Sequence, residues 1–422
     1  MTYISRTDLN IVQIPTTIPT MGPVGSIVTD PDFKSRIVRA TDASTNPSLV
    51  KNYSAGIGGS ADANIWNTDS TMLSVADDGG FSVLLGFTPA TLAIKRIFPN
   101  SRVVGGCLFS KINPNVMFNM QGTKIVQYDL SNRTLAALPA PVTVCDFASQ
   151  LTGKIEWADF GGVENQDTVM SATFSISGGQ GTGVYACVWT ATKGYRTWNT
   201  ETGQVTGDWG PLGQVAPCTD KFQIHNAKLN KGTAEYLIVA SSAGTSTPNY
   251  FWRHDSLTVN NIGHVAPGGH WAGGYGHFYN NDSAPNIPFW SHTQRCLCDL
   301  NDATKIATPA PTASLMVGLG DHVSINGPSE SLLVSFTSLV LPVGSVIKSF
   351  PAAWYNEVIG FDLSGTGKVY RFCHTFCKSN TGNFYADNAI GAVDQQNKFA
   401  AFTSDWMGTI NRISDVFIVE LK

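Results

Sequence analysis

Short runs of apolar residues separated by polar turns recur along this chain of 422 residues. In six segments an apolar run leads into a turn built on Asp, Asn, Thr, Pro or Gly and then into a second run. These segments are residues 84–97, 125–138, 195–207, 250–262, 295–306 and 358–372. Strands of about 4–8 residues joined by such turns are β-hairpins. No helical periodicity of any length competes with this pattern, so it predicts an all-β protein.

A second pair of strands precedes several of these hairpins. Residues 63–79, 225–242 and 388–408 each hold a polar turn followed by an apolar run. Together with the hairpin behind it, such a pair makes a four-stranded unit. Four-stranded units repeated every few tens of residues are typical of β-propeller blades.

The last unit has only three predicted strands, and it ends with "DVFIVELK" at 415–422. Residues 34–43, "KSRIVRATDA", form an isolated strand that no early unit claims. We predict that this strand completes the last blade, because pairing the two chain ends removes both open edges of the ring. The prediction is a seven-bladed propeller over residues 34–422, preceded by an extension, residues 1–33, that lies extended along its outside.

Charge and composition narrow the range of partners. Lys and Arg total 27 against 31 acids, for a net charge of −4, whereas nucleic-acid binding favours a clear basic surplus. Only 14% of the residues are charged, so uncharged polar residues must cover the surface, as is common in secreted and cell-surface β-proteins. The first ten residues hold no signal peptide, which leaves a cytoplasmic location open. The apolar stretch 331–347 is interrupted by Ser, Thr and Pro342, which predicts sheet core and no membrane span.

Eight cysteines are present, at positions 107, 145, 187, 218, 296, 298, 373 and 377. Most lie inside apolar strand patterns, which favours buried free thiols. Two alternatives remain open, a zinc site and a disulfide, each between the segments 296–298 and 373–377. Neither segment has the C-x₂-C spacing usual for zinc.

Histidines recur on successive predicted blades. The innermost strand of each blade lines the channel of a propeller, so equivalent positions converge although they are far apart in sequence. The histidines in or beside these strands are His225, His270, His277, His322 and His374. Neutral imidazoles suit Mn, Zn or Ni, and His270, His277 and His322 are the predicted ligands of one divalent metal. The alternative is that each His only hydrogen-bonds a loop or packs against aromatic rings.

The segment "PGGHWAGGYGHFYNN", 267–281, holds five glycines around Trp271 and Tyr275. Two aromatic rings beside histidines could form a platform for a sugar ring, and Arg253 and Arg295 could bind its acidic groups. The alternative is a glycine-rich loop between blades with aromatic plugs, and lone cations that are merely solvated.

The last unit resembles the TolB-type propeller repeat. Ser404, Asp405, Trp406 and Gly408 match the "aFtSdr-G" strand of that repeat, and Asp394–Lys398 stands where the repeat has a Pro-Asp-Gly turn. This resemblance implies a propeller fold and a structural role for Asp405. The histidines on successive blades are also similar to those of oligogalacturonate lyases, seven-bladed propellers with a His-bound metal at the channel. No lyase motif matches residue for residue.

Cleavage of an acidic polysaccharide by β-elimination needs a cation beside the carboxylate and a base for the α-proton. His225 with Lys228, or His374 with Arg371, could serve. Residues 371 and 374 face opposite sides of a regular strand, so the second pair requires a bulge.

The sequence has no G-x-S-x-G elbow, phosphate loop, dinucleotide fingerprint or H-E-x-x-H motif. We therefore expect a propeller that binds a glycan or cleaves it as a metal-assisted lyase at a His-lined channel mouth. The alternative is a non-catalytic binding, adhesion or assembly propeller whose partner is another protein. The lyase hypothesis requires at least three of the five histidines within reach of one metal. The binding hypothesis expects them scattered, with a patch of exposed aromatic residues instead.

Overall fold

The structure is a computed structural model. It describes residues 3–46, 52–56, 63–153, 155, 157–175, 184–218, 224–232, 235–241, 249–263, 271–280, 296–299, 302–307, 322–337, 350, 353–364, 366, 368–378, 389–410 and 413–422.

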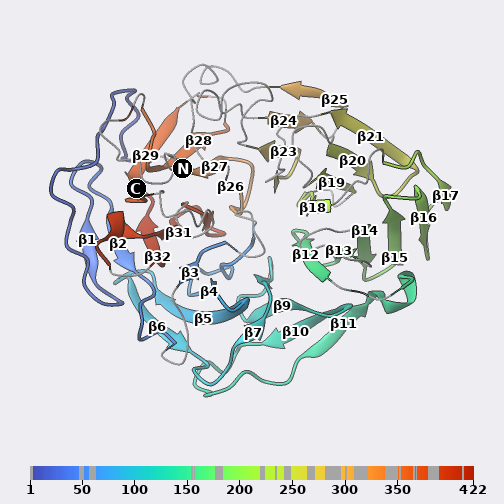
Figure 1. Ribbon diagram of the computed structural model, residues 1–422, viewed down its shortest axis with the longest axis horizontal. Helices are drawn as coiled ribbons and strands as arrows, with labels where there is room; N and C mark the ends of the chain where they lie inside the picture. Colours follow the sequence, from blue (N-terminus) through green and yellow to red (C-terminus); the bar gives the residue numbers. More distant parts are fainter. Residues whose placement is uncertain are drawn as a thin grey trace.

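Seven antiparallel sheets are formed by the described residues, and they stand in a ring around a central axis (Figure 1). We number them as blades in chain order. Blade 1 holds β3 (Tyr53–Ser54), β4 (Met72–Asp77), β5 (Phe81–Thr88), β6 (Ala93–Ile97) and β7 (Val103–Val104). Blade 2 holds β8 (Cys107–Phe109), β9 (Val116–Gln121), β10 (Lys124–Asp129) and β11 (Val142–Asp146). Blade 3 holds β12 (Trp157–Val163), β13 (Val169–Ser175), β14 (Tyr185–Thr190), β15 (Gly194–Asn199), β16 (Gln204–Gly207) and β17 (Gly213–Gln214).

The other four sheets follow the same order. Blade 4 holds β18 (Ile224–Leu229), β19 (Tyr236–Ser241), β20 (Asn249–Arg253) and β21 (Thr258–Gly263). Blade 5 holds β22 (Ala272–Gly273), β23 (His277–Asn280), β24 (Cys296–Asp299) and β25 (Asp302–Ala307). Blade 6 holds β26 (His322–Ser324), β27 (Leu332–Phe336), β28 (Glu357–Asp362) and β29 (Val369–His374). Blade 7 holds β30 (Gly391–Val393), β31 (Phe399–Ser404), β32 (Asp415–Glu420), β2 (Arg36–Arg39) and β1 (Ile27–Thr29).

Two short 3₁₀-helices, η1 (Phe147–Gln150) and η3 (Trp406–Gly408), lie between strands. Asp405 accepts hydrogen bonds from the backbone N–H groups of Met407 and Lys378, at 3.2 and 2.8 Å, and so fixes the start of η3. This is the structural role expected for Asp405. No helix in the described residues is long and apolar enough to cross a membrane.

Both faces of a blade pack against neighbouring blades, which explains why many strands are apolar throughout. All six residues of β31, "FAAFTS", are buried, as are the first five of β32. A strand buried on both faces reads as a continuous apolar run and does not alternate. One buried cluster accordingly runs from blade 7 through blades 1 and 2 to blade 3.

The ring closes as predicted. In blade 7, β2 pairs antiparallel with β32, with Ile37 opposite Val419 and Arg39 opposite Phe417. A buried ion pair reinforces the junction, since Nη2 of Arg39 lies 2.5 Å from Oδ2 of Asp415. The N-terminal and C-terminal strands therefore share one sheet, and neither leaves an open edge at this junction.

Two predicted hairpins differ from the observed ones. In blade 2 the fourth strand, β11, begins only after Pro139 and Pro141, because proline has no N–H to donate to a neighbouring strand. In blade 3 the predicted hairpin 195–207 consists of the fourth and fifth strands, and β16 and β17 extend the sheet to six strands.

The N-terminal arm, residues 3–25, contacts blades 6 and 7 before it reaches β1. The backbone N–H of Arg371 in β29 donates to the carbonyl of Arg6 at 2.9 Å. The side-chain amide of Gln13 exchanges two hydrogen bonds with the backbone of Phe350. The indole N–H of Trp406 donates to the carbonyl of Pro19 at 2.8 Å. The arm is thus tied to the outer strand of blade 6 and to blade 7.

Candidate functional site

An acid, Asp159, and a cation, Lys228, lie on the innermost strands of two adjacent blades, blades 3 and 4. These strands line the central channel. Lys228 lies in β18, where it is buried, and Asp159 lies in β12 of the adjacent blade. Burial raises the pKa of Asp159 to about 6, while the positive charge of Lys228 and a backbone hydrogen bond act to lower it. A carboxyl group with a pKa near neutrality, beside a cation, is suited to proton transfer.

Gly161 allows β12 and β18 to approach each other closely. A Cβ atom on Gly161 would lie 2.7 Å from the carbonyl oxygen of Ala227 and 2.6 Å from Oγ of Ser171, distances that no real side chain tolerates. The register of β12 also shifts at this point, between Phe160 and Gly162. Such a bulge re-aims the neighbouring side chains.

A strip of buried hydroxyl groups lies beside Asp159. Asp159 pairs with Thr173 of β13, and cross-strand partners share a face of the sheet. Ser171 and Ser175 lie two residues to either side of Thr173 and share that face. All three hydroxyl oxygens are buried, and none has a hydrogen-bond partner within the described parts of the chain. Buried polar groups of this kind are normally satisfied by water or by a ligand.

Lysine side chains cross the channel at one end. Lys111 in the first turn of blade 2 donates to the carbonyl of Asn326 in blade 6 at 3.1 Å. Lys231 in the first turn of blade 4 donates to the carbonyl of Ile325 at 2.8 Å. Asp159 lies near the start of β12 and therefore toward the opposite end from these turns.

The described histidines do not gather at the channel. His322 lies in the innermost strand β26 and is buried, whereas His277 lies in the second strand β23, with Nδ1 2.8 Å from Oε2 of Glu330. His374 precedes the last inner strand in sequence, but it ends β29, the outermost strand of blade 6, and so lies away from the channel. His225 lies at a register shift in β18, and its side chain, like the whole of His270, is outside the described residues.

The predicted sugar platform and its cations are also placed differently. Trp271 is 1% exposed and belongs to the core, so its face is not available to a sugar. The Tyr275 hydroxyl donates to the carbonyl of Gly327 at 2.9 Å, and burial raises the pKa of Tyr275 to about 12. Arg253, on the third strand of blade 4, is exposed and paired with Asp255 at 2.8 Å. Arg295 lies outside the described residues.

Arg371 has a structural partner that the sequence did not reveal. Its Nε and Nη2 atoms donate to the two carboxylate oxygens of Glu357 at 2.8 and 2.6 Å, and both side chains are fully buried. The register of β29 shifts between Arg371 and Cys373, which is the bulge that places Arg371 and His374 on the same side. The Arg371 guanidinium and the His374 ring both lie against Phe33, at 5.2 and 4.9 Å.

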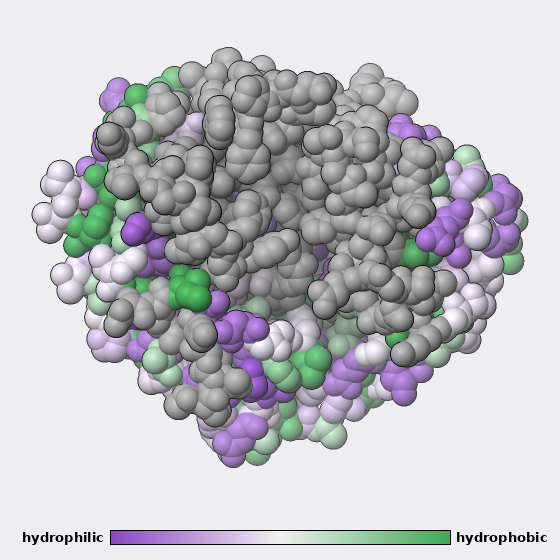
Figure 2. Space-filling model, viewed as in Figure 1, coloured by the Kyte–Doolittle hydropathy of each residue, from purple (hydrophilic) through white to green (hydrophobic). Residues whose placement is uncertain are grey.

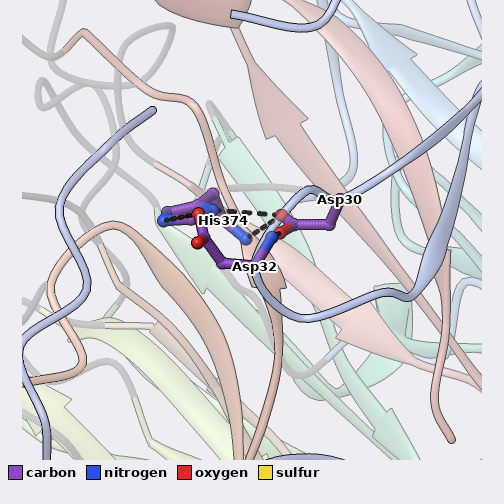
Figure 3. A group of neighbouring side chains, drawn as sticks. All are labelled: Asp30, Asp32 and His374. Atoms are coloured by element: carbon purple, nitrogen blue, oxygen red, sulfur yellow. Dashed lines mark hydrogen bonds and ion pairs between the residues drawn. The ribbon is translucent and has the colours of Figure 1, made fainter. Parts of the chain in front are cut away.

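The His374 ring belongs to a cluster with Asp30 and Asp32, which precede the closing strand β2 (Figure 3). One carboxylate oxygen of Asp30 accepts both the backbone N–H of His374, at 2.8 Å, and its ring Nδ1, at 3.1 Å. The other oxygen accepts the N–H groups of Asp32 and Phe33. Burial acts to raise the pKa of Asp30, but the imidazole and these N–H groups outweigh it and lower that pKa below its usual value.

Oδ2 of Asp32 lies 3.9 Å from Nε2 of His374. One atom from each of Asp30, Asp32 and His374 lies within 4.8 Å of the others, so this group could hold a metal ion. No other group of three His, Cys, Asp or Glu ligands meets that condition in the described part of the chain. In the sequence, only the segment "TDPDFK", which is typical of a turn, could have pointed to Asp30 and Asp32 as members of a site.

Six cysteines, Cys107, Cys145, Cys187, Cys218, Cys373 and Cys377, are free and buried, as expected for structural thiols. Burial raises the pKa of Cys107, Cys145, Cys187 and Cys218 to about 12, which keeps these thiols unreactive. The side chains of Cys296 and Cys298 lie outside the described residues, so the zinc and disulfide alternatives stay untested.

Large exposed apolar side chains in the described residues are aliphatic, so the exposed aromatic patch expected for a binding propeller is not found among them. Figure 2 shows hydrophobic and hydrophilic residues interspersed around the rim of one face. Three of the exposed side chains, Ile4, Leu9 and Ile11, lie close together in sequence on the N-terminal arm.

Comparison with known proteins confirms the fold. A solved structure of oligogalacturonate lyase in complex with manganese has a TM-score of 0.56 with this chain at 12% identity, covering 98% of both chains. The β-propeller domain of the Trilobed protease from Pyrococcus furiosus has a TM-score of 0.39 at 7% identity, over 83% of this chain and 91% of that one. The sequence matches no protein-family model and no curated protein. The first likeness shows an all-β propeller.

Proposed function

We propose that the protein binds an acidic glycan in its central channel and cleaves it by β-elimination, as a lyase of uronic-acid polysaccharides. The observation that carries this proposal is the placement of Asp159 and Lys228 on the innermost strands of adjacent blades. The likeness in fold to an oligogalacturonate lyase structure supports the choice of substrate class.

Each residue has a defined part in the reaction. The ammonium of Lys228 pairs with the uronate carboxylate and so acidifies the α-proton. The ionised carboxylate of Asp159 takes that proton. The electron pair of the broken C–H bond forms the new double bond, the glycosidic C–O bond breaks, and the leaving oxygen takes a proton from water.

A metal-assisted form of this proposal would place Mn, Zn or Ni on His270, His277 and His322. Nδ1 of His277 is engaged by Glu330, His322 is buried in β26, and His270 lies outside the described residues. We therefore derive the chemistry from Asp159 and Lys228. An extracellular or cell-surface location belongs to the same proposal, because polymeric glycans of this class lie outside the cell.

The test is cleavage of polygalacturonate and alginate, followed by the ultraviolet absorbance of the unsaturated sugar that β-elimination creates. Asp159→Asn should lower kcat by about 10²–10⁴-fold, as expected for loss of a general base, while glycan binding persists. Lys228→Met should raise KM as well. Asp69→Asn, at an exposed turn, is the matched control and should change neither.

Activity of the native protein should rise with pH and level off above the Asp159 pKa of about 6, because the base must be ionised. The same ionisation opposes folding. A raised pKa means that the protonated carboxyl favours the folded state at low pH and that this contribution is lost as pH rises through 6. Asp159→Asn should therefore unfold at higher temperature than the native protein at pH 8 and lose that advantage near pH 4.

Absence of both binding and product on every uronate polymer would contradict the proposal. Full activity of Asp159→Asn would place the base elsewhere.

A non-catalytic assembly role is the second candidate, and the exposed side chains of the arm favour it. Ile4, Leu9 and Ile11 are 93%, 54% and 48% exposed, and large exposed apolar side chains within one short segment suit an interaction with another protein surface. If the arm mediates assembly, light scattering should show an oligomer that the triple change Ile4→Ser, Leu9→Ser and Ile11→Ser dissociates. A monomer in both proteins would remove this candidate.

A further inference from the structure

The cluster of Asp30, Asp32 and His374 lies at the outer edge of blade 6, away from the innermost strands, and the proposed glycan chemistry does not use it (Figure 3). Asp30 is fully buried and its carboxylate is saturated. Each oxygen already accepts two hydrogen bonds, from Asp32 and Phe33 on one side and twice from His374 on the other. A carboxylate has about four acceptor positions, so Asp30 has none left for an ion.

The hydrogen bond to Asp30 fixes the His374 ring. Because Nδ1 donates to Asp30, the neutral ring carries its lone pair on Nε2. This Nε2 atom is buried and has no hydrogen-bond partner among the residues that the structure describes. It points toward the carboxylate of Asp32, whose Oδ2 is 3.9 Å away.

A buried acceptor atom without a hydrogen bond is unfavourable, and one that faces a carboxylate oxygen is stabilised by a positive group between the two atoms. The distance of 3.9 Å is too long for a direct hydrogen bond. It is shorter than twice a metal–ligand bond of about 2.1 Å, so a single ion can reach both atoms. A carboxylate that holds Nδ1–H while Nε2 faces outward is also the usual support of a metal-bound histidine.

We propose that Nε2 of His374 and the carboxylate of Asp32 bind one divalent transition-metal ion, with Asp30 as the residue that positions the imidazole. Imidazole together with carboxylate suits Zn²⁺, Ni²⁺ or Mn²⁺. The Asp32 side chain is 37% exposed, so water completes the coordination from that side.

The ion joins two parts of the ring that are distant in sequence. Asp32 belongs to the turn between β1 and the closing strand β2 of blade 7, and His374 ends β29 of blade 6. Metal binding therefore ties the closing strand to the neighbouring blade, and it should stabilise the folded protein by mass action.

The test uses the whole protein after treatment with a chelator, titrated separately with Zn²⁺, Ni²⁺ and Mn²⁺ by calorimetry. We expect one equivalent of at least one of these ions to bind and to raise the melting temperature. Asp32→Asn should weaken binding at least tenfold. Asp30→Asn should weaken it about 10–100-fold, as does loss of other partners of metal-bound histidines. Asp129→Asn, at the exposed end of β10, is the matched control and should leave affinity unchanged.

Asp32→His distinguishes two roles of the Asp32 carboxylate, that of a metal ligand and that of a counter-charge for a protonated imidazole. It replaces the carboxylate by a second imidazole, so binding of Zn²⁺ or Ni²⁺ should persist although the negative charge is lost. If the positive group between the two side chains is only a proton on Nε2, Asp32→His binds no metal and neither does the native protein.

Unchanged affinity in Asp32→Asn would overturn the proposal, because it would place the ion elsewhere, and so would the absence of any stoichiometric binding. Asp32→Asn should leave glycan cleavage unaffected, which distinguishes failure of this proposal from failure of the lyase proposal.

Discussion

Two histidines of this protein are held by carboxylates in the same way, yet only one of them completes a candidate site. Glu330 accepts the backbone N–H of His277 at 2.9 Å and its ring Nδ1 at 2.8 Å. Asp30 accepts the same two groups of His374, at 2.8 and 3.1 Å. In each pair the carboxylate comes from a different blade than the histidine and joins the two blades.

The pairs differ in their surroundings. The His277 side chain is 33% exposed, and its pair lies beside the first turns of blades 5 and 6. The His374 side chain is fully buried, and its second nitrogen faces another carboxylate. A His–carboxylate pair can therefore simply connect two blades. The His374 pair is a candidate metal site because it is buried and because the carboxylate of Asp32 faces its second ring nitrogen.

The largest difference between the pairs should appear when the carboxylate is neutralised. Asp30→Asn removes one partner of a fully buried pair and sets an amide N–H₂ against hydrogen-bond donors, so the free energy of unfolding should fall by about 3–5 kcal/mol. Denaturant unfolding with a chelator present measures this loss. A loss below about 1 kcal/mol would show that the Asp30 pair is no stronger than an exposed one.

Glu330→Gln should cost less, about 1 kcal/mol, because water can replace part of the lost interaction. Burial acts to raise the pKa of Glu330, but His277 and the backbone N–H groups lower it overall. A lowered pKa stabilises the fold above the unfolded-state value and loses this contribution as pH falls through the folded-state value. The difference between native protein and Glu330→Gln should accordingly be full at pH 7 and shrink below pH 4. A constant difference would contradict this assignment.

The smallest effect is expected for Asp32→Asn without metal. Because the side chain is partly exposed and lies 3.9 Å from His374, the free energy of unfolding should change by no more than about 0.5 kcal/mol. Comparison of melting curves with and without chelator checks this. A large loss in the metal-free protein would mean that Asp32 acts mainly as the counter-charge of a protonated His374.

Much of the fold could be predicted from local patterns. The closing strand was recognisable because residues 34–43 lacked a partner in the first blade and the last blade lacked a fourth strand, and β2 does pair with β32. The second arm of the predicted hairpin 195–207 is β16, but a fifth and a sixth strand in blade 3 were not predicted, since a four-stranded repeat gives no reason to continue a sheet.

The candidate sites were less predictable. Lys228 was correctly placed in an innermost strand, but its partner Asp159 is one acid within "WADFGG" and meets Lys228 only through the packing of blades. His374 was singled out for the channel, although its environment depends on which strand of a blade it ends. The sequence did not predict roles for Asp30 and Glu357. The partner of Asp30, His374, lies hundreds of residues away, and the partner of Glu357, Arg371, lies beside a bulge.

The junction between β2 and β32 also sets the order of assembly. The partner strands are separated by nearly the whole chain, and such distant pairing is slow because a long loop must close first. During synthesis β2 leaves the ribosome before the strands of blades 1 to 6, and its partner β32 leaves only after them. The apolar edge of β2 must therefore wait unpaired while the other blades form. An intermediate of this kind is prone to aggregation, and a chaperone that shields β2 should raise the yield of folded protein.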